Sequence, residues 1–325
     1  MRNTKWIRVI LIFIFPVFFS TTHAEDGKVS GYMFGDFYYT FSDPDTSVHY
    51  NGFQLRRVYF NYDRNLSETF SVRFRLEMNS SPKQQLEPYI KNAYLAWKNL
   101  IPNSTIYFGA QGTPTWDVSE KVWGYRSVSK MIMDLNGVAS SSDLGIGIKG
   151  KFNDSGSFGY HVLIANGEGK KGESNEYKKV FVSIPLVFAD NFHLVPYADY
   201  EGAANDMNKQ TVALFAGMSG ETINAGVEIF QKTNAKALAG DDLVENGISV
   251  FGSLNVAEKL KGFARFDMYD PNTDQEDDGY NLVIAGIDYE ADENVNIIPN
   301  IHIESYQLSG KDNLITGMLT FFYRF

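Results

Sequence analysis

The sequence contains no cysteine. An exported chain without cysteine has no disulfide framework, so its stability must come from closed backbone pairing or from a large core. Long apolar runs are also absent after Ala24, because a charge, a glycine or a proline interrupts each later apolar stretch within about ten residues. Any crossing of a membrane must therefore use strands.

Positive charge is scarce. The chain has 29 basic and 39 acidic residues, and removal of the first 24 residues would take away three basic ones, which leaves 26 against 39 and a net charge of −13. No basic cluster with interleaved aromatic residues and no phosphate-binding glycine motif relieves this balance. These features exclude a nucleic-acid-binding protein.

Motifs for catalysis and metal binding are also missing. His49, His161, His193 and His302 are isolated along the chain, and no Gly-x-Ser-x-Gly elbow is present. We therefore predict no enzymatic activity, no cofactor and no metal. A catalytic triad assembled from distant strands is the alternative that the sequence leaves open.

Residues 1–24 are typical of a secretory signal peptide. Three positive charges in the first eight residues precede an apolar run over 9–19 that only Pro16 interrupts, and Thr22-His23-Ala24 supplies small residues at the positions that a signal peptidase reads. The run is shorter than the roughly 20 residues of a membrane-spanning helix. Cleavage after Ala24 is predicted, with residues 25–325 as the mature domain; an uncleaved anchor is the alternative.

The mature chain divides into sixteen segments of about ten residues with period-two alternation, each ended by Gly, Asn, Asp, Ser or Pro. This pattern predicts an all-β fold, a transmembrane antiparallel barrel of about 16 strands. The expected strands are 29–41, 53–64, 69–78, 90–97, 105–111, 143–152, 158–165, 178–188, 193–200, 209–219, 222–231, 246–256, 260–270, 280–290, 295–306 and 314–325.

The connections between these segments alternate in length. Every second one is short, and the others are longer: 42–52, 79–89, 112–142, 166–177, 201–208, 232–245, 271–279 and 307–313. A barrel with both termini in the periplasm has this asymmetry, with tight periplasmic turns and long outer loops. An even strand count near sixteen also leaves a lumen wide enough for water.

The faces of single strands agree with this interpretation. Segment 69–78 alternates apolar residues with Ser71, Arg73, Arg75 and Glu77, although a soluble sheet with a core and a wet face would alternate in the same way. The last segment ends in Tyr323-Arg-Phe325, which resembles the signal that the outer-membrane barrel assembly machinery recognises.

The longest connection, 112–142, follows the fifth strand and is the third outer loop. It combines aromatic residues with charges of both signs, and Asp117 and Glu120 have the spacing of a capping box that begins a short helix. We expect this loop to fold inward and narrow the lumen. A surface loop on the barrel rim is the alternative.

If the apolar side of each strand faces lipid, charged side chains line the lumen and select ions by their sign. We expect one basic wall, on strands two, three and six. Mutual pairing of these charges without selectivity is the alternative, and a β-bulge would invert part of a strand, as the shared parity of Phe53, Leu55 and Arg57 warns. The candidate residues at the constriction are Arg57, Arg73, Arg75, Glu77, Asp117, Glu120, Arg126, Lys130, Lys149, Lys151 and Arg265.

Strands two to five resemble the phosphate-selective porin family, porins O and P. The matching stretches are LRRVYFNYD at 55–63, FSVRFRLE at 70–77, IKNAYLAW at 90–97 and YFGAQGTP at 107–114. The resemblance covers about a fifth of the chain and implies a sixteen-stranded barrel, a homotrimer, and in some members a preference for anions such as phosphate. This chain departs from the pattern at Gly112, where family members commonly have a lysine, and in its acidic composition.

The sequence thus predicts an outer-membrane porin of a Gram-negative-type cell, through which small hydrophilic solutes or anions diffuse passively. Its expected partners are outer-membrane lipid, the assembly machinery and two further copies of the chain. The competing interpretation is a non-conducting barrel that serves as a binding or structural scaffold, such as an adhesin. A plugged transporter is disfavoured, because the first strand begins near Val29.

Overall fold

We describe a computed structural model of the chain over residues 27–46, 49–80, 86–189 and 191–325. The predicted signal peptide, 1–24, lies outside the described residues. Nearly all regular structure is β. The strands are β1 (Lys28–Ser42), β2 (Asn51–Asn65), β3 (Phe70–Met78), β4 (Tyr89–Lys98), β5 (Ser104–Gly112), β6 (Ser142–Lys151), β7 (Gly159–Ala165), β8 (Lys179–Ser183), β9 (Leu186–Phe188), β10 (Phe192–Glu201), β11 (Lys209–Ser219), β12 (Ile223–Leu238), β13 (Asp241–Ala257), β14 (Leu260–Asp270), β15 (Tyr280–Asp292), β16 (Val295–Tyr306) and β17 (Leu314–Arg324).

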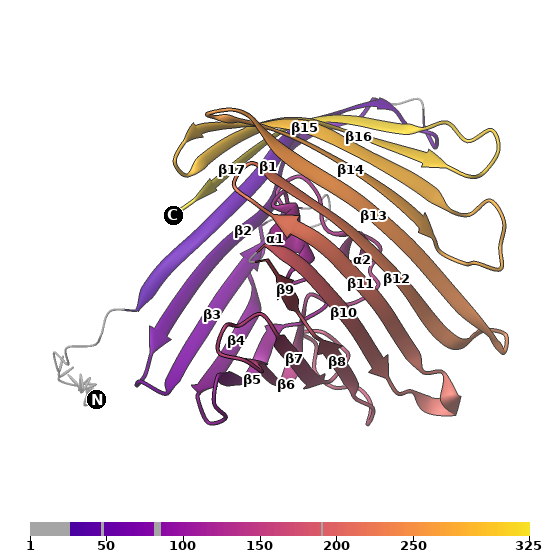
Figure 1. Ribbon diagram of the computed structural model, residues 1–325. Coiled ribbons are helices and arrows are strands. Elements are labelled where there is room, and N and C mark those ends of the chain that lie inside the picture. Colours follow the sequence, from indigo (N-terminus) through magenta and orange to yellow (C-terminus); the bar gives the residue numbers. More distant parts are fainter. Residues whose placement is uncertain (1–26, 47–48, 81–85, 190) are drawn as a thin grey trace, which may run out of the picture.

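These strands form one closed antiparallel barrel (Figure 1). Each strand pairs with its neighbours in the sequence, and β1 also pairs with β17, which closes the ring. The elements β8 and β9 are two halves of one strand, since both pair with β10. They separate at Pro185, which has no N–H to donate to the ladder. The barrel therefore has sixteen strands, and this prediction is confirmed.

The connections alternate in length as predicted, with one exception. We call the two ends of the barrel the short-turn end and the long-loop end. The expected long loop at 232–245 is wrong, because β12 extends to Leu238 and β13 begins at Asp241. Polar side chains hold this hairpin together: Lys232 forms an ion pair of 2.9 Å with Glu245, which also accepts a hydrogen bond from Asn234. Polar composition had indicated a loop, but β12 pairs with β13 as far as Asn234 and Leu243, and Leu238 pairs with Asp241 after an irregularity.

One β-bulge interrupts the pairing of β2 with β1, and another interrupts the pairing of β4 with β3. Phe34 pairs with Arg57 but the next residue of β1, Gly35, pairs with Leu55, so Arg56 is the extra residue. In the same way Arg75 pairs with Asn92 and Leu76 with Ile90, which leaves Lys91 as the extra residue of β4. A bulge inverts the alternation of faces. It explains why Phe53 is 83 % exposed while Arg57, of the same parity, is buried.

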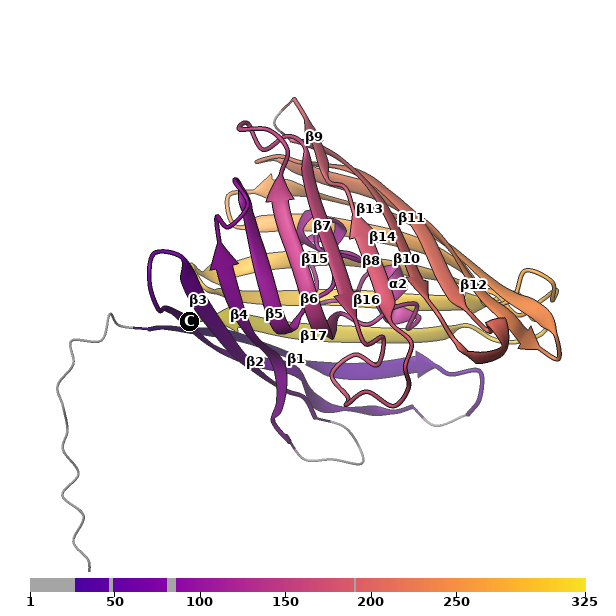
Figure 2. The same ribbon diagram turned by 90° about the horizontal axis from the view of Figure 1, so that it is seen from below.

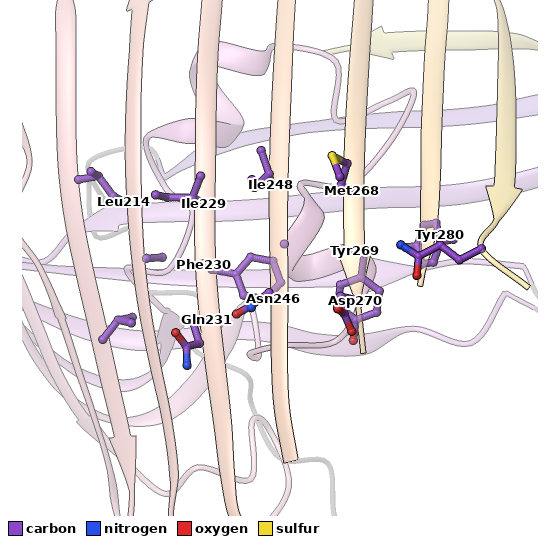
Figure 3. Close-up of a pocket in the computed structure, with 14 residues that line it drawn as sticks. Leu214, Ile229, Phe230, Gln231, Asn246, Ile248, Met268, Tyr269, Asp270 and Tyr280 are labelled. Carbon is purple, nitrogen blue, oxygen red and sulfur yellow. The ribbon is translucent and has the colours of Figure 1, made fainter. Parts of the chain in front are cut away.

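The outward face of the barrel is apolar. Figure 3 shows one stretch along β11–β15, where Leu214, Ile229, Ile248 and Met268 stand in a row beside a hollow of about 600 Å³. Each of these four side chains is exposed.

The third long loop, 113–141, lies inside the ring of strands (Figures 1 and 2). It contains two short helices, α1 (Ser119–Trp123) and α2 (Ile132–Leu135). Its apolar side chains form a core with the inward residues of β10–β16. Trp123 makes edge contacts with Phe251 and Phe263, and Tyr125 stacks on Phe263 with 4.1 Å between the ring centres. In the described part of the chain, no helix has the length and apolarity to cross a membrane.

We expect a substitution of Gly31, at the seam where β1 meets β17, to destabilise the barrel. Gly31 exchanges two backbone hydrogen bonds with Phe325, and a Cβ atom at Gly31 would lie 2.3 Å from the Tyr59 carbonyl oxygen and 2.5 Å from the Phe325 ring. Gly31→Ala should therefore lower the free energy of unfolding by about 1–3 kcal/mol, the usual cost of overpacking. The measurement is urea unfolding of the purified barrel in lipid vesicles.

The matched control is Gly52→Ala in β2, where the added Cβ would have no neighbour closer than 3.4 Å. Equal unfolding midpoints for the two variants would contradict the seam described here.

Candidate functional site

The loop inside the barrel separates two cavities. One, of about 820 Å³, lies at the long-loop end and is lined by residues of β2–β4, the loop and β15–β17. The other, of about 740 Å³, lies at the short-turn end. Arg126 of the loop lines both cavities, so the two spaces approach each other at this side chain.

The first cavity contains a cluster with a net positive charge on the wall formed by β2–β4. It consists of Arg57, Lys91 and the carboxylate of Glu77. Arg57 donates a hydrogen bond of 2.9 Å to Glu77, and the Lys91 ammonium lies 3.3 Å from the other oxygen of the same carboxylate. Lys91 also donates to the Ser141 hydroxyl at 2.6 Å, at the end of the loop. One buried carboxylate thus compensates two cations.

The loop brings a second group of charges to the junction of the cavities. The Arg126 guanidinium lies 3.2 Å from Glu120 and 3.5 Å from Asp134, and Lys130 lies 3.3 Å from Asp134. Burial and the nearby charge of Arg57 lower the pKa of Arg126. Burial raises the pKa of Glu120 above its usual value, although Arg126 and Arg57 act in the opposite direction.

Arg56 fixes the loop to the barrel wall. Its guanidinium donates to the backbone carbonyl oxygens of Ser127 and Val128, the latter at 2.9 Å, and forms a two-pronged ion pair with Asp36. Asp36 is fully buried and also accepts a hydrogen bond from Thr320 at 2.5 Å. Such planar, charge-assisted pairs are geometrically specific, and Arg56 therefore fixes the position of the loop next to Arg126.

Arg265 holds the loop from the opposite wall. It is 2 % exposed, pairs with Asp267 and donates a hydrogen bond of 2.5 Å to the Lys130 carbonyl oxygen. It lies beneath the loop, and neither cavity reaches it. Glu228 is buried there as well and accepts a hydrogen bond from Ser119 at 2.8 Å.

The remaining predicted site residues lie elsewhere in the barrel. Asp117 forms ion pairs of 2.9 Å with Lys121 and 2.6 Å with Lys149 in a separate cavity of about 410 Å³ behind the loop. Burial alone would raise the pKa of Asp117, but the two lysines hold it below its usual range. The predicted capping box is wrong: the residue before α1 is Val118, and no side chain caps the helix.

Arg73 and Arg75 lie on the wall of β3. Arg73 pairs with Asp63 at 2.6 Å, and Arg75 donates to the Asn61 side chain at 2.5 Å. Lys151 is exposed at the end of β6, beside the turn at 152–158. Of the predicted residues, the structure therefore brings five together at the two cavities: Arg57, Glu77, Glu120, Arg126 and Lys130.

Sequence reasoning missed Arg56 and Lys91, because alternation places both on the lipid side. Each is the extra residue of a bulge and so faces inward. The sign of a bulge in the sequence was that Phe53, which is apolar, and Arg57, which is charged, have the same parity in β2 and would face the same side of a regular strand. Sequence reasoning also missed the inward aromatic wall of Phe215, Phe230, Phe251 and Phe263, since the expectation that apolar residues face lipid fails where the loop covers the lumen side.

Comparison with solved structures identifies the architecture. The anion-selective porin from Comamonas acidovorans superposes with a TM-score of 0.69 at 12 % identity, over 92 % of this chain and 99 % of the other. The chain has the porin fold. The outer membrane channel DcaP of Acinetobacter baumannii gives a TM-score of 0.64 at 12 % identity, over 94 % and 99 % of the two chains.

A trimer form of OmpT, an outer membrane protein of Vibrio cholerae, gives a TM-score of 0.61 at 13 % identity, over 92 % and 99 % of the two chains. No family model and no curated protein matches the sequence. The resemblance to porins O and P thus extends to the porin fold, while the phosphate-selective family is not established by these comparisons.

Removing Arg56 should release the loop. The chain has no cysteine, so Val128→Cys, at a position 1 % exposed, provides a single thiol that reports on the loop. In Arg56→Met we expect a water-soluble maleimide to label this thiol at least about ten times faster, since a charge-assisted hydrogen bond typically contributes about 1.5–3 kcal/mol.

Arg73→Met, which removes an arginine that does not contact the loop, is the matched control and should leave the rate unchanged. An unchanged rate in Arg56→Met would show that other contacts suffice to fix the loop.

Proposed function

We propose that this protein is an outer-membrane porin through which small hydrophilic solutes diffuse passively. The observation that carries the proposal is the pair of cavities, of about 820 and 740 Å³, one at each end of the barrel, that approach each other at Arg126. Residues 113–141 narrow the lumen between them. The porin fold supports the proposal as an analogy, because function depends on the site rather than on the fold.

The outer surface supports a position in a membrane. Exposed aromatic residues gather near both ends of the strands, as in the interfacial girdles of membrane barrels. Those at the short-turn end are Phe152, Phe158, Phe188, Phe192, Tyr289, Tyr323 and Phe325, and those at the long-loop end are Phe41, Tyr50, Phe53 and Tyr200. The band between them includes the apolar row in Figure 3.

The charges of the long-loop cavity favour anions. Its lining contains six basic residues and three acidic ones. The basic residues are Arg56, Arg57, Lys91, Arg126, Lys130 and Lys170, and the acidic ones are Glu77, Asp134 and Glu304. Fixed charge of one sign raises the local concentration of counter-ions in a narrow pore. We also propose that the channel prefers phosphate among anions, as the resemblance to porins O and P implies.

A location in the outer membrane requires that the chain is exported and then inserted into that membrane. Residues 1–24 would be removed during export, and the carboxy-terminal Tyr323 and Phe325 would serve as the signal for the assembly machinery. A homotrimer is proposed by analogy with the trimer form of OmpT.

The decisive test is single-channel recording in a planar bilayer. The protein is isolated from the outer-membrane fraction, and its intact mass shows whether residues 1–24 have been removed. We expect stepwise openings and a reversal potential in a potassium chloride gradient that favours chloride. Added phosphate should reduce the chloride current. Lys91→Gln should lower the chloride preference, because it removes a cation from the cavity wall.

The matched control is Lys151→Gln, at the exposed end of β6. Absence of openings from folded protein would contradict the channel and favour a binding or structural scaffold. Preference for potassium would contradict the anion selectivity and leave a general porin.

The raised pKa of Glu120 predicts a pH-dependent selectivity. A carboxyl with a raised pKa loses its charge at a higher pH than an ordinary glutamate, so more of it is neutral at pH 5 than at pH 7. Its neutralisation leaves Arg126 less compensated, while Arg57, Lys91 and Asp134 still face the same space. The chloride-to-potassium permeability ratio should therefore rise roughly twofold on acidification, a modest change because salt screens a single charge.

Glu120→Gln should show the high ratio at both pH values. Glu290→Gln changes a carboxylate of the short-turn cavity and should retain the wild-type response. A wild-type ratio that does not change with pH would refute the role of Glu120.

A further inference from the structure

The long-loop cavity has two chemically different sides. Its cations belong mainly to β2, β4 and the long loops, whereas apolar and aromatic side chains reach it from β15, β17 and helix α2. The apolar group consists of Leu135, Tyr280, Leu282, Leu314 and Met318. A channel for inorganic ions alone has no use for such a surface, because water wets it poorly.

The cationic side has charge that the protein does not neutralise. Arg57 and Lys91 share the single carboxylate of Glu77. Lys170 has no carboxylate partner among the described residues, and its ammonium lies 5.6 Å from the centre of the Tyr89 ring. Arg126 and Lys130, by contrast, are balanced by Glu120 and Asp134. Two positive charges therefore remain available on the wall formed by Arg57, Lys91 and Lys170.

The apolar side lies within the same cavity. Tyr280 is held in place by a hydrogen bond of 2.6 Å to the Asn136 side chain, next to α2. Leu135 is 39 % exposed although it belongs to the loop that buries most of its other apolar residues. Glu304 is the carboxylate on this side of the lining. The cavity of about 820 Å³ is large enough for an organic molecule.

We propose that the long-loop cavity selects organic monocarboxylates with an apolar or aromatic body. The carboxylate binds at Arg57, Lys91 and Lys170, and the body lies against Leu135, Tyr280 and Met318. This rests on the proposed channel function and names the class of solute that the pore admits best. The cations attract every anion, and the apolar surface distinguishes among them, since burial of apolar area stabilises only solutes that have some.

The test compares benzoate with acetate in the bilayer. Reversal potentials with the sodium salts on opposite sides give the permeability of each anion relative to chloride. Benzoate is larger than acetate and diffuses more slowly, so a simple water-filled pore passes acetate better. We expect the reverse order, with benzoate favoured by at least about twofold, because its ring buries apolar area in the cavity.

Two variants assign the effect to the apolar side. Leu135→Gln and Met318→Gln should each bring the benzoate-to-acetate ratio below one. Leu308→Gln, in the long loop 307–313 and outside the cavity lining, is the matched control and should retain the wild-type ratio. Lys170→Gln should reduce the permeability of both anions to a similar extent.

The outcomes separate this inference from the proposed function. An anion-selective channel that prefers acetate overturns the inference and leaves the porin. A channel that prefers cations, or folded protein without openings, overturns both. The wild-type comparison alone decides the question, so a variant that fails to fold does not prevent the test.

Discussion

The closed ladder of backbone hydrogen bonds is the constraint on which the rest of this structure depends. An unpaired amide in hydrocarbon costs several kcal/mol, so strands can cross a bilayer only if none of them is an edge. Pairing of β1 with β17 removes the last edge, and the exchange between Gly31 and Phe325 extends it to the final residue. Because the ladder fixes every register, it also determines which side chains enter the lumen.

The two bulges change which side chains of β2 and β4 face the lumen. Regular alternation would give β2 and β4 one inward residue in every two, and would place Arg56 and Lys91 outside. Instead each strand presents two adjacent residues inward, Arg56 with Arg57 and Lys91 with Asn92. All of them except Asn92 line the long-loop cavity. Arg56 then fixes the loop and Lys91 adds charge to the wall. A local irregularity in pairing thus supplies both an anchor for the loop and part of the positive charge of the long-loop cavity.

Local patterns in the sequence predicted the strands, their number and the alternation of turns and loops, because each depends on residues close together along the chain. The inward aromatic wall could not be predicted in this way. Phe251 and Phe263 face inward because Trp123, more than a hundred residues earlier in the chain, covers them. The prediction of a loop at 232–245 failed for the opposite reason. The residues of this hairpin are polar, as in a loop, but cross-strand pairs such as Lys232 with Glu245 keep the two strands extended. In the first case a contact across the lumen overrides the local pattern, and in the second a contact between neighbouring strands does so.

A net charge of −10 would suggest a channel for cations, yet the long-loop cavity has a surplus of positive charge. The two facts agree because many carboxylates lie far from this cavity or are already paired. Asp117 is compensated by two lysines behind the loop, Asp36 by Arg56, and Asp267 by Arg265. A paired and buried carboxylate contributes little field to the pore, whereas Arg57, Lys91 and Lys170 have one carboxylate between them. The proposed anion selectivity therefore depends on which charges the folded chain leaves uncompensated in the long-loop cavity, and composition does not contain that information.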